Sequence, residues 1–223
     1  MHTITLVATV HKERGLCNSN ELLKIIEVTT PEVVFEEQSP GNFSAIYNGS
    51  ESDTLETKAI KKHLQKHPIK HIPVDKDNTE YLNNGFKNDM DELFNIFAIV
   101  EDYNKIWYQR NVLTYKYGFP FLNSEYCAVL FEYLNQMEVM ILKIQNNERL
   151  SHLHKVWLDI HHKRENEMIN NIYEFSLKNK YDRALFLVGA EHRKPLIEKI
   201  QKFREKESIE LNWDFEYFKD KET

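Results

Sequence analysis

Ionisable side chains follow four apolar runs of the sequence. His11 comes directly after TITLVATV, Glu36 and Glu37 close VVFEE, Asp75 follows IKHIPV, and Glu191 and His192 follow RALFLVGA. Histidines close to carboxylates suit two kinds of chemistry. One is a divalent metal ion that activates water, and the other is acid–base catalysis in which a carboxylate orients a histidine.

The four runs predict strands, and their order predicts where the ionisable residues meet. In open α/β sheets, ligands bind outside the carboxyl ends of the parallel strands. A polar residue at one strand end is weakly informative because the chain is leaving the core there, so the coincidence of four carries the prediction. Glu36 and Glu37 are adjacent and point to opposite faces of an extended chain, so we expect only one to face the crevice. Asp75 could also belong to a turn.

The elements that must position these residues indicate an α/β fold. Strand-like runs at 3–10, 33–37 and 69–74 alternate with helical segments at 19–29 and 53–67, which predicts a mostly parallel central sheet. Long helical segments, roughly 88–117, 124–147 and 150–180, form a large helical insertion at about 80–180. Strand character returns at 183–190, a helix follows from Pro195, and 210–218 alternates as a C-terminal edge strand. We expect residues 1–223 to form one domain.

Two helical residues are harder to interpret. Arg164 falls inside an apolar stripe at helical spacing, so it faces the core and needs a carboxylate partner or an anionic ligand. Both roles stay open. With Asp53 as N-cap, Glu56 occupies the N3 position of a capping box, which favours a structural role, although Glu56 also lies near the apolar face of its helix. The crowded histidines 152, 154, 161 and 162 predict a solvated polar face.

Composition and missing motifs argue against several classes of function. Acidic residues outnumber basic ones, 35 to 29, and the net charge of −6 disfavours nucleic acid and anionic membranes as partners. No apolar stretch is long enough to span a membrane and no secretion signal is evident, so we expect a cytoplasmic protein. Cys17 and Cys127 suit reduced thiols. Without G-x-G-x-x-G, G-K-[ST], G-x-S-x-G or C-x-x-C motifs, no nucleotide, serine nucleophile or zinc ribbon is predicted.

Short motifs occur in a recognisable order along the chain. GAEH ends at His192, and ATVH ends at His11 with Ala8 where a glycine would complete the same G-x-x-H pattern. PEVVFEE ends at Glu37, and KRENEMINNI contains Arg164 with Glu165 inserted before Asn166. In this order the motifs resemble the TraB/PrgY/Tiki family, part of a broader set with erythromycin esterase-like and ChaN-like proteins. The resemblance covers residues 1–75 and 150–200.

The resemblance implies a metal-dependent hydrolase of peptidase or esterase type. His11, Glu37, Arg164 and His192 would be the catalytic residues, and His11, Glu36, Glu37 and His192 would hold a divalent metal ion, Mn, Co or Zn. Glu56, Asp75 and Glu191 are further candidates. The substrate would be a small molecule or a peptide. Two alternatives stay open: a non-catalytic module that binds a peptide or a small anion, and a metal-independent acid–base esterase.

Overall fold

The computed structural model describes residues 2–49, 53–77, 84–203 and 209–219, and its centre is a parallel sheet. The sheet has five strands in the order β3-β2-β4-β1-β5, and each neighbouring pair is parallel. The strands are β1 (His2–Thr9), β2 (Val33–Glu36), β3 (Lys70–Pro73), β4 (Arg183–Gly189) and β5 (Leu211–Asp214). The predicted α/β class, the mostly parallel sheet and the C-terminal edge strand are confirmed.

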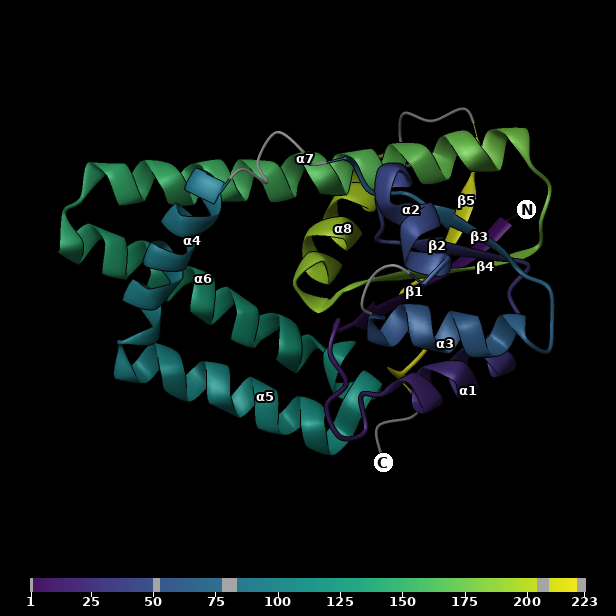
Figure 1. Ribbon diagram of the computed structural model, residues 1–223, viewed down its shortest axis with the longest axis horizontal. Helices are drawn as coiled ribbons and strands as arrows, with labels where there is room; N and C mark the ends of the chain where they lie inside the picture. The colour runs from purple at the N-terminus through teal and green to yellow at the C-terminus, as the bar shows by residue number, and fades with distance from the viewer. Residues whose placement is uncertain (1, 50–52, 78–83, 204–208, 220–223) are drawn as a thin grey trace.

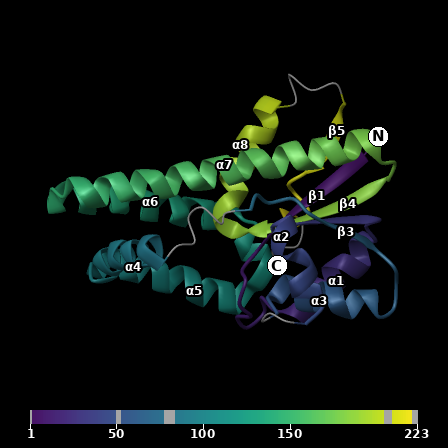
Figure 2. The same ribbon diagram turned by 45° about the horizontal axis from the view of Figure 1, so that its top comes forward.

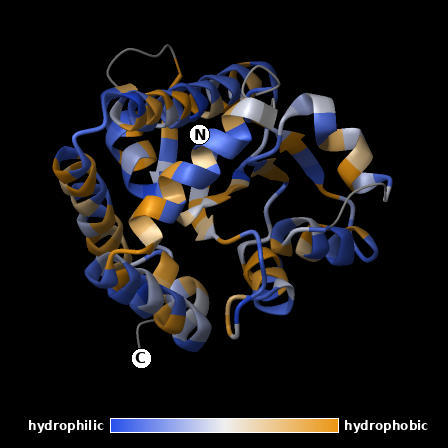
Figure 3. Cartoon of the chain, turned by 60° about the vertical axis from the view of Figure 1, so that its left-hand side comes forward, coloured by the Kyte–Doolittle hydropathy of each residue, from blue (hydrophilic) through white to orange (hydrophobic). Residues whose placement is uncertain are grey.

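Helices cover both faces of this sheet (Figure 1). They are α1 (Ser19–Thr29), α2 (Pro40–Tyr47), α3 (Leu55–Leu64), α4 (Asn84–Ala98), α5 (Glu101–Leu122), α6 (Glu125–Gln145), α7 (Glu148–Lys178) and α8 (Ala190–Phe203). Apolar side chains of α1 and α3 pack with Val34 and Leu185 on one face, and those of α7 and α8 pack with Phe35 and Phe186 on the other. In Figure 3 the hydrophobic residues gather on the central strands and on the helix sides that face them.

The predicted helical insertion is present between β3 and β4, and its start before residue 84 lies outside the described residues. Helices α4, α5, α6 and the first half of α7 extend away from the sheet as a helical arm (Figure 2). The arm has a hydrophobic core of its own, which includes Leu93, Phe97, Leu134 and Leu153. The 31-residue helix α7 then returns along the sheet, so one rigid element connects the arm to the strand ends. No helix among the described residues is long and apolar enough to cross a membrane.

Three local predictions were wrong. The segment predicted as one helix at 88–117 is divided between α4 and α5, because the chain leaves helical geometry at residues 99–100. Between β2 and the next predicted helix, where only a polar loop containing Pro40 and Gly41 was expected, the chain forms α2, which has Pro40 in its first turn, where a missing N–H costs nothing. Helix α8 begins at Ala190 and contains Pro195 one turn in, so Glu191 and His192 lie on a helix and not in a turn.

Two glycines fasten the loop after β1 to helix α5. Gly15 has φ +53° and a Cβ there would lie 2.2 Å from the Tyr115 carbonyl oxygen, while Gly118 has φ +60° and a Cβ there would lie 2.7 Å from the Leu16 carbonyl oxygen. The Leu16 N–H also donates to the Tyr115 carbonyl at 2.9 Å. This close backbone approach fixes the loop that carries His11 and Arg14 against the helical arm.

Replacing Gly118 with alanine should therefore destabilise the protein for two reasons. A left-handed backbone costs an alanine about 1–2 kcal/mol, and the new methyl group would also collide with the Leu16 carbonyl. Gly49→Ala is the matched control, since Gly49 has φ +88° but no atom of the described residues within 4 Å of a Cβ. We expect urea denaturation to show a larger loss for Gly118→Ala than for Gly49→Ala. Equal losses would mean that the loop is not held as described.

Candidate functional site

The residues predicted at the strand ends meet in one depression at the carboxyl edge of the sheet. A main cleft of about 550 Å³ is lined by His11, Glu37, Asp75 and Arg164, together with apolar side chains of α4 and α7. A second lobe of about 430 Å³ is also lined by His11, Glu37 and Arg164, and it adds His192. Because the two hollows share these residues, they form one site with two compartments.

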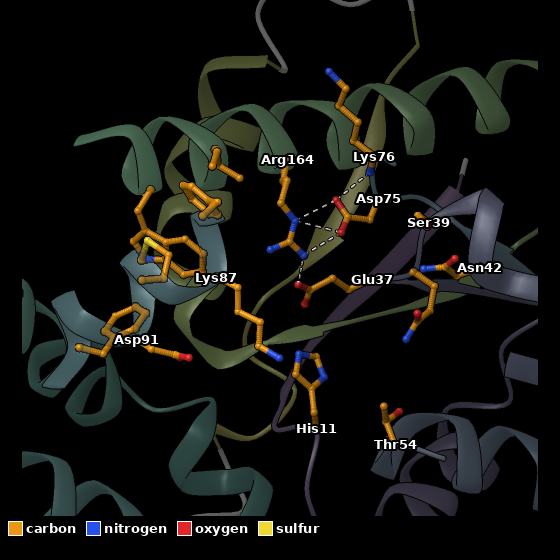
Figure 4. A pocket seen from close by; sticks show the side chains of 16 residues that line it. His11, Glu37, Ser39, Asn42, Thr54, Asp75, Lys76, Lys87, Asp91 and Arg164 are labelled. Carbon is orange, nitrogen blue, oxygen red and sulfur yellow. Dashed lines mark hydrogen bonds and ion pairs between the residues drawn. The ribbon is translucent and has the colours of Figure 1, made fainter. Parts of the chain in front are cut away.

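Arg164, on α7, joins two strand ends (Figure 4). Its Nη2 donates to Glu37 Oε1 at 2.5 Å and to Asp75 Oδ2 at 2.7 Å, and its Nε donates to Asp75 Oδ2 at 3.0 Å. All three side chains are mostly buried, with exposed fractions of 17% for Arg164 and 7% for each carboxylate. Burial alone would lower the pKa of Arg164, but Asp75 and Glu37 raise it above its usual value. The predicted buried ion pair is therefore present, with a second carboxylate added.

Glu37 connects this pair to the next strand and helix. Its Oε2 accepts a hydrogen bond from the backbone N–H of Gly189 at 2.6 Å, and its Oε1 lies 3.4 Å from His192 Nε2. Burial would raise the pKa of Glu37, but the contact with His192 and the charge of Arg164 hold it well below its usual range. Glu37 is therefore a carboxylate at neutral pH.

His192 is held by a carboxylate on each side. Its Nδ1 lies 2.8 Å from Glu165 Oε1, and Lys199 donates to the other oxygen of Glu165 at 2.7 Å. Burial would lower the pKa of His192, yet the hydrogen bonds with Glu165 and Glu37 raise it to about 10. The imidazole is accordingly protonated at neutral pH. Neither Glu165 nor Lys199 was predicted as part of the site.

His11 differs from the other site residues because its side chain is 58% exposed. Its Nδ1 lies 3.6 Å from Oε1 of Glu56, a buried residue on α3 that also accepts a hydrogen bond from Thr9. The interaction with Glu56 raises the pKa of His11. The other oxygen of Glu56, Oε2, is buried without a hydrogen-bond partner among the described residues. His11 therefore presents an accessible imidazole backed by a buried carboxylate.

The capping role predicted for Glu56 was wrong. The N-cap of α3 is Thr54, whose hydroxyl accepts a hydrogen bond from the Thr57 N–H, and not Asp53. Asp53 instead pairs with Lys61. Because the helix begins one residue later than expected, Glu56 is turned toward β1 and His11, where it can orient the imidazole.

Two candidates lie apart from this group. Glu36 points to the other face of β2, where Oε2 accepts from the Tyr47 hydroxyl at 2.5 Å and Oε1 lies 2.9 Å from His71 Nδ1. Only Glu37 faces the crevice, in agreement with the alternation of an extended strand. Glu191 lines the second lobe with an exposed side chain, and it forms no ion pair within the described part of the chain.

The histidines of α7 do not form one solvated face. His152 and His162 are exposed, but His154 is buried with Nε2 2.9 Å from Glu138 Oε2 in the helical arm. His161 lies between Trp157 and His192, with ring centroids 4.0 Å and 4.9 Å away. Burial and the neighbouring His192 lower the pKa of His161 to about 3, so its ring is neutral.

Three of the four predicted metal ligands, Glu36, Glu37 and His192, have their donor atoms engaged by other groups of the protein. Glu37 accepts from Arg164 and from the Gly189 N–H, and His192 has Nδ1 2.8 Å from Glu165 and Nε2 3.4 Å from Glu37. Glu36 is turned away, and the described residues contain no group of three or more His, Cys, Asp or Glu arranged to hold a metal ion. In this arrangement the residues present do not fit a divalent ion coordinated by His11, Glu36, Glu37 and His192.

Comparisons of the chain with protein-family models, with curated proteins and with solved structures found no match. The resemblance to the TraB/PrgY/Tiki family therefore stays an expectation. The structure itself defines an α/β protein with a parallel sheet, a helical arm and an ionised crevice at the carboxyl edge of its strands.

Replacing Arg164 with methionine should leave two buried carboxylates without their cation. Breaking a buried ion pair costs about 3–5 kcal/mol, so we expect a loss of unfolding free energy of that size. Arg149→Met is the matched control, because Arg149 lies on the same helix and also pairs with two carboxylates, Asp89 and Glu92, but is 53% exposed. Exposed pairs contribute about 0–1 kcal/mol. Similar losses for the two variants in urea denaturation would contradict the buried network.

Proposed function

We propose that the protein is a hydrolase of esterase or peptidase type in which His11, oriented by Glu56, activates water by general base catalysis. The observation that carries this proposal is the accessible His11 imidazole, which faces the main cleft and is backed by a buried carboxylate. A general base needs access to substrate, a pKa near the working pH and a fixed orientation. Among the candidate histidines, His192 is buried and paired with two carboxylates, whereas His11 is accessible and is backed by Glu56, which also raises its pKa.

Arg164 would supply the positive charge for the reaction. Its Nε and Nη2 are held by Asp75 and Glu37, and its third nitrogen, Nη1, takes no part in these contacts. In Figure 4 the guanidinium lies across the cleft from His11. A cation fixed before the reaction stabilises the negative charge that develops on a carbonyl oxygen without a cost of reorganisation. The paired carboxylates thus serve to position Arg164.

The cleft suits a substrate with an apolar portion. Its outer wall consists of side chains of α4 and α7: Phe86, Met90, Phe94, Trp157 and Ile160. Lys87 and Asp91 add charge at the mouth, and Lys87 reaches toward His11 in Figure 4. A carbonyl group placed between His11 and Arg164 would therefore leave one end of the substrate against the helical arm. This supports a small ester or peptide as substrate.

The proposed reaction needs no group beyond water and these side chains. His11 removes a proton from water as the oxygen bonds to the carbonyl carbon, and Arg164 stabilises the resulting oxyanion. When the intermediate collapses, the bond to the leaving oxygen or nitrogen breaks, and protonated His11 returns the proton to that atom. His11 ends the cycle neutral, as it began.

His11→Gln should lower kcat/KM by about a hundredfold or more, the usual contribution of a general base. The assay is a panel of p-nitrophenyl esters and short fluorogenic peptides, run with and without a chelator. His152→Gln is the control, since His152 is an exposed histidine outside both compartments. We expect chelation to leave the wild-type rate unchanged. Loss of activity in chelator with recovery in Mn, Co or Zn would favour the metal-dependent reaction, and a panel without any turnover would favour the binding module.

Glu56→Gln should move the rising limb of the pH profile to lower pH. Because the Glu56 carboxylate raises the pKa of His11, its removal lets His11 lose its proton at a lower pH, so kcat/KM rises earlier as pH increases. The maximal rate should fall because the imidazole is less well oriented. Glu27→Gln, at an exposed position on α1, should leave the limb in place. An unshifted limb in Glu56→Gln would show that His11 is not the titrating base.

A further inference from the structure

Arg110 is a buried cation without an anionic partner. Its side chain belongs to α5 and the residue is 9% exposed, but no carboxylate of the described residues forms an ion pair with it. Its Nη2 donates to Asn111 Oδ1 at 3.4 Å, and its Nε is buried without a hydrogen-bond partner in the part of the chain that the structure describes. The guanidinium carbon lies 3.9 Å from the ring centre of Trp107 and 4.8 Å from that of Phe131.

This arrangement is costly in the absence of an anion. Stacking on aromatic rings stabilises a guanidinium by about 1–2 kcal/mol, which is less than the several kcal/mol that burial of an ion costs. Burial accordingly lowers the pKa of Arg110. Arg164, which is buried to a similar degree, has two carboxylates in direct contact. The burial of Arg110 therefore carries a cost that an anion from outside the chain would offset.

Arg110 lines the second lobe together with two further unpaired cations. Lys12 and Arg14, on the loop after β1, are exposed and form no ion pair within the described ranges. The loop is fastened to α5 through Gly15 and Tyr115, which holds Arg14 near Arg110 without a ligand. On the same helix, the Thr114 hydroxyl donates to the Arg110 carbonyl at 2.8 Å. The backbone segments that carry Arg14 and Arg110 are thus fixed relative to each other.

The acidic groups of the lobe do not neutralise this cluster. Glu37 is occupied by Arg164 and the Gly189 N–H. Glu191 lies in the lobe and acts on Arg110 at a distance, without an ion pair to it. Three cations therefore face one carboxylate that is not otherwise paired.

We propose that the second lobe is a binding site for an anionic group, a phosphate or a carboxylate, held by Arg110, Arg14 and Lys12. Guanidinium groups match the oxygens of both anions and form charge-assisted hydrogen bonds with them. The site adjoins His11 and Arg164, which line both compartments. As a subsite for the anionic end of a substrate it rests on the proposed hydrolase, whereas the binding of an anion does not.

Binding, rather than turnover, is the decisive measurement. Inorganic phosphate and succinate are titrated separately at constant ionic strength, by calorimetry and by tryptophan fluorescence, with Trp107 stacked on Arg110 as the reporter. Wild type should bind at least one of the two with saturation, and the anion that binds identifies the preferred group. Arg14→Gln combined with Lys12→Gln should weaken binding by at least about tenfold, because the loss of even one hydrogen bond to a charged group costs about 1.5–3 kcal/mol. Both residues are exposed, so this variant should fold.

Lys116→Gln is the control, since Lys116 is an exposed cation on the same helix and outside the lobe. It should bind with wild-type affinity. Arg110→Gln, where it folds, should abolish both the binding and the fluorescence change. The proposal is overturned if neither anion binds with saturation, or if the Lys12 and Arg14 double variant binds as tightly as wild type. Saturable binding without any hydrolysis would support the anion site and contradict the proposed hydrolase activity.

Discussion

The contact of Arg164 with Glu37 and Asp75 is the interaction on which the site depends. It joins the ends of β2 and β3 to α7, and through Glu37 it reaches the backbone of Gly189, where β4 becomes α8. His192, Glu165 and Lys199 extend it between α7 and α8. Three anions and three cations are thus paired below the surface of the cleft. Each buried charge is tolerated because the next one compensates it.

This pairing divides the site into two parts: one whose charges are held by buried ion pairs, and one, at His11, that is exposed to solvent. Arg164, Glu37 and His192 are locked in charge and position by their partners, which suits electrostatic stabilisation and does not suit proton exchange. His11 stands opposite, exposed, with one carboxylate behind it. Carboxylates raise the pKa of both histidines, so what distinguishes His11 from His192 is its exposure. The division also explains why only one of the two strand-end histidines is a candidate base.

Much of this arrangement could be predicted from the sequence. Runs of β-branched residues located the strands, a parallel sheet required their ends to share an edge, and the apolar stripe of α7 showed that Arg164 faces inward. Glu165 was not predicted as a site residue, because in the motif it is only an insertion between Arg164 and Asn166. Adjacent residues on a helix point about 100° apart, so Arg164 contacts the ends of β2 and β3 while Glu165 contacts His192 and Lys199 on α8. Lys199 follows His192 by seven residues, two turns along one face of α8, which is a signal that spacing could have given.

Other errors came from choices that local sequence leaves nearly equal. Asp53 and Thr54 are both good N-caps, and which one is used decides whether Glu56 faces solvent or His11. The predicted start of α8 depended on Pro195, but Pro195 lies inside the helix, after its first turn. In both places, tertiary packing determined the residue at which the helix begins. The direction in which Glu56 or His192 points is therefore a property of the packed strands and helices.

Arg110 and Arg164 show how burial and pairing together distinguish a structural ion from a binding one. Both are arginines on long helices that face the same depression. Arg164 has its carboxylates within the protein, so the folded chain is complete without a ligand at that point. Arg110 has aromatic rings but no carboxylate in contact, although Glu191 lies in the same lobe. Bringing Glu191 into contact with Arg110 would relieve the burial cost, yet the helix that carries it is fixed by His192 one residue later. The contacts that fix His192 thus keep Glu191 apart from Arg110.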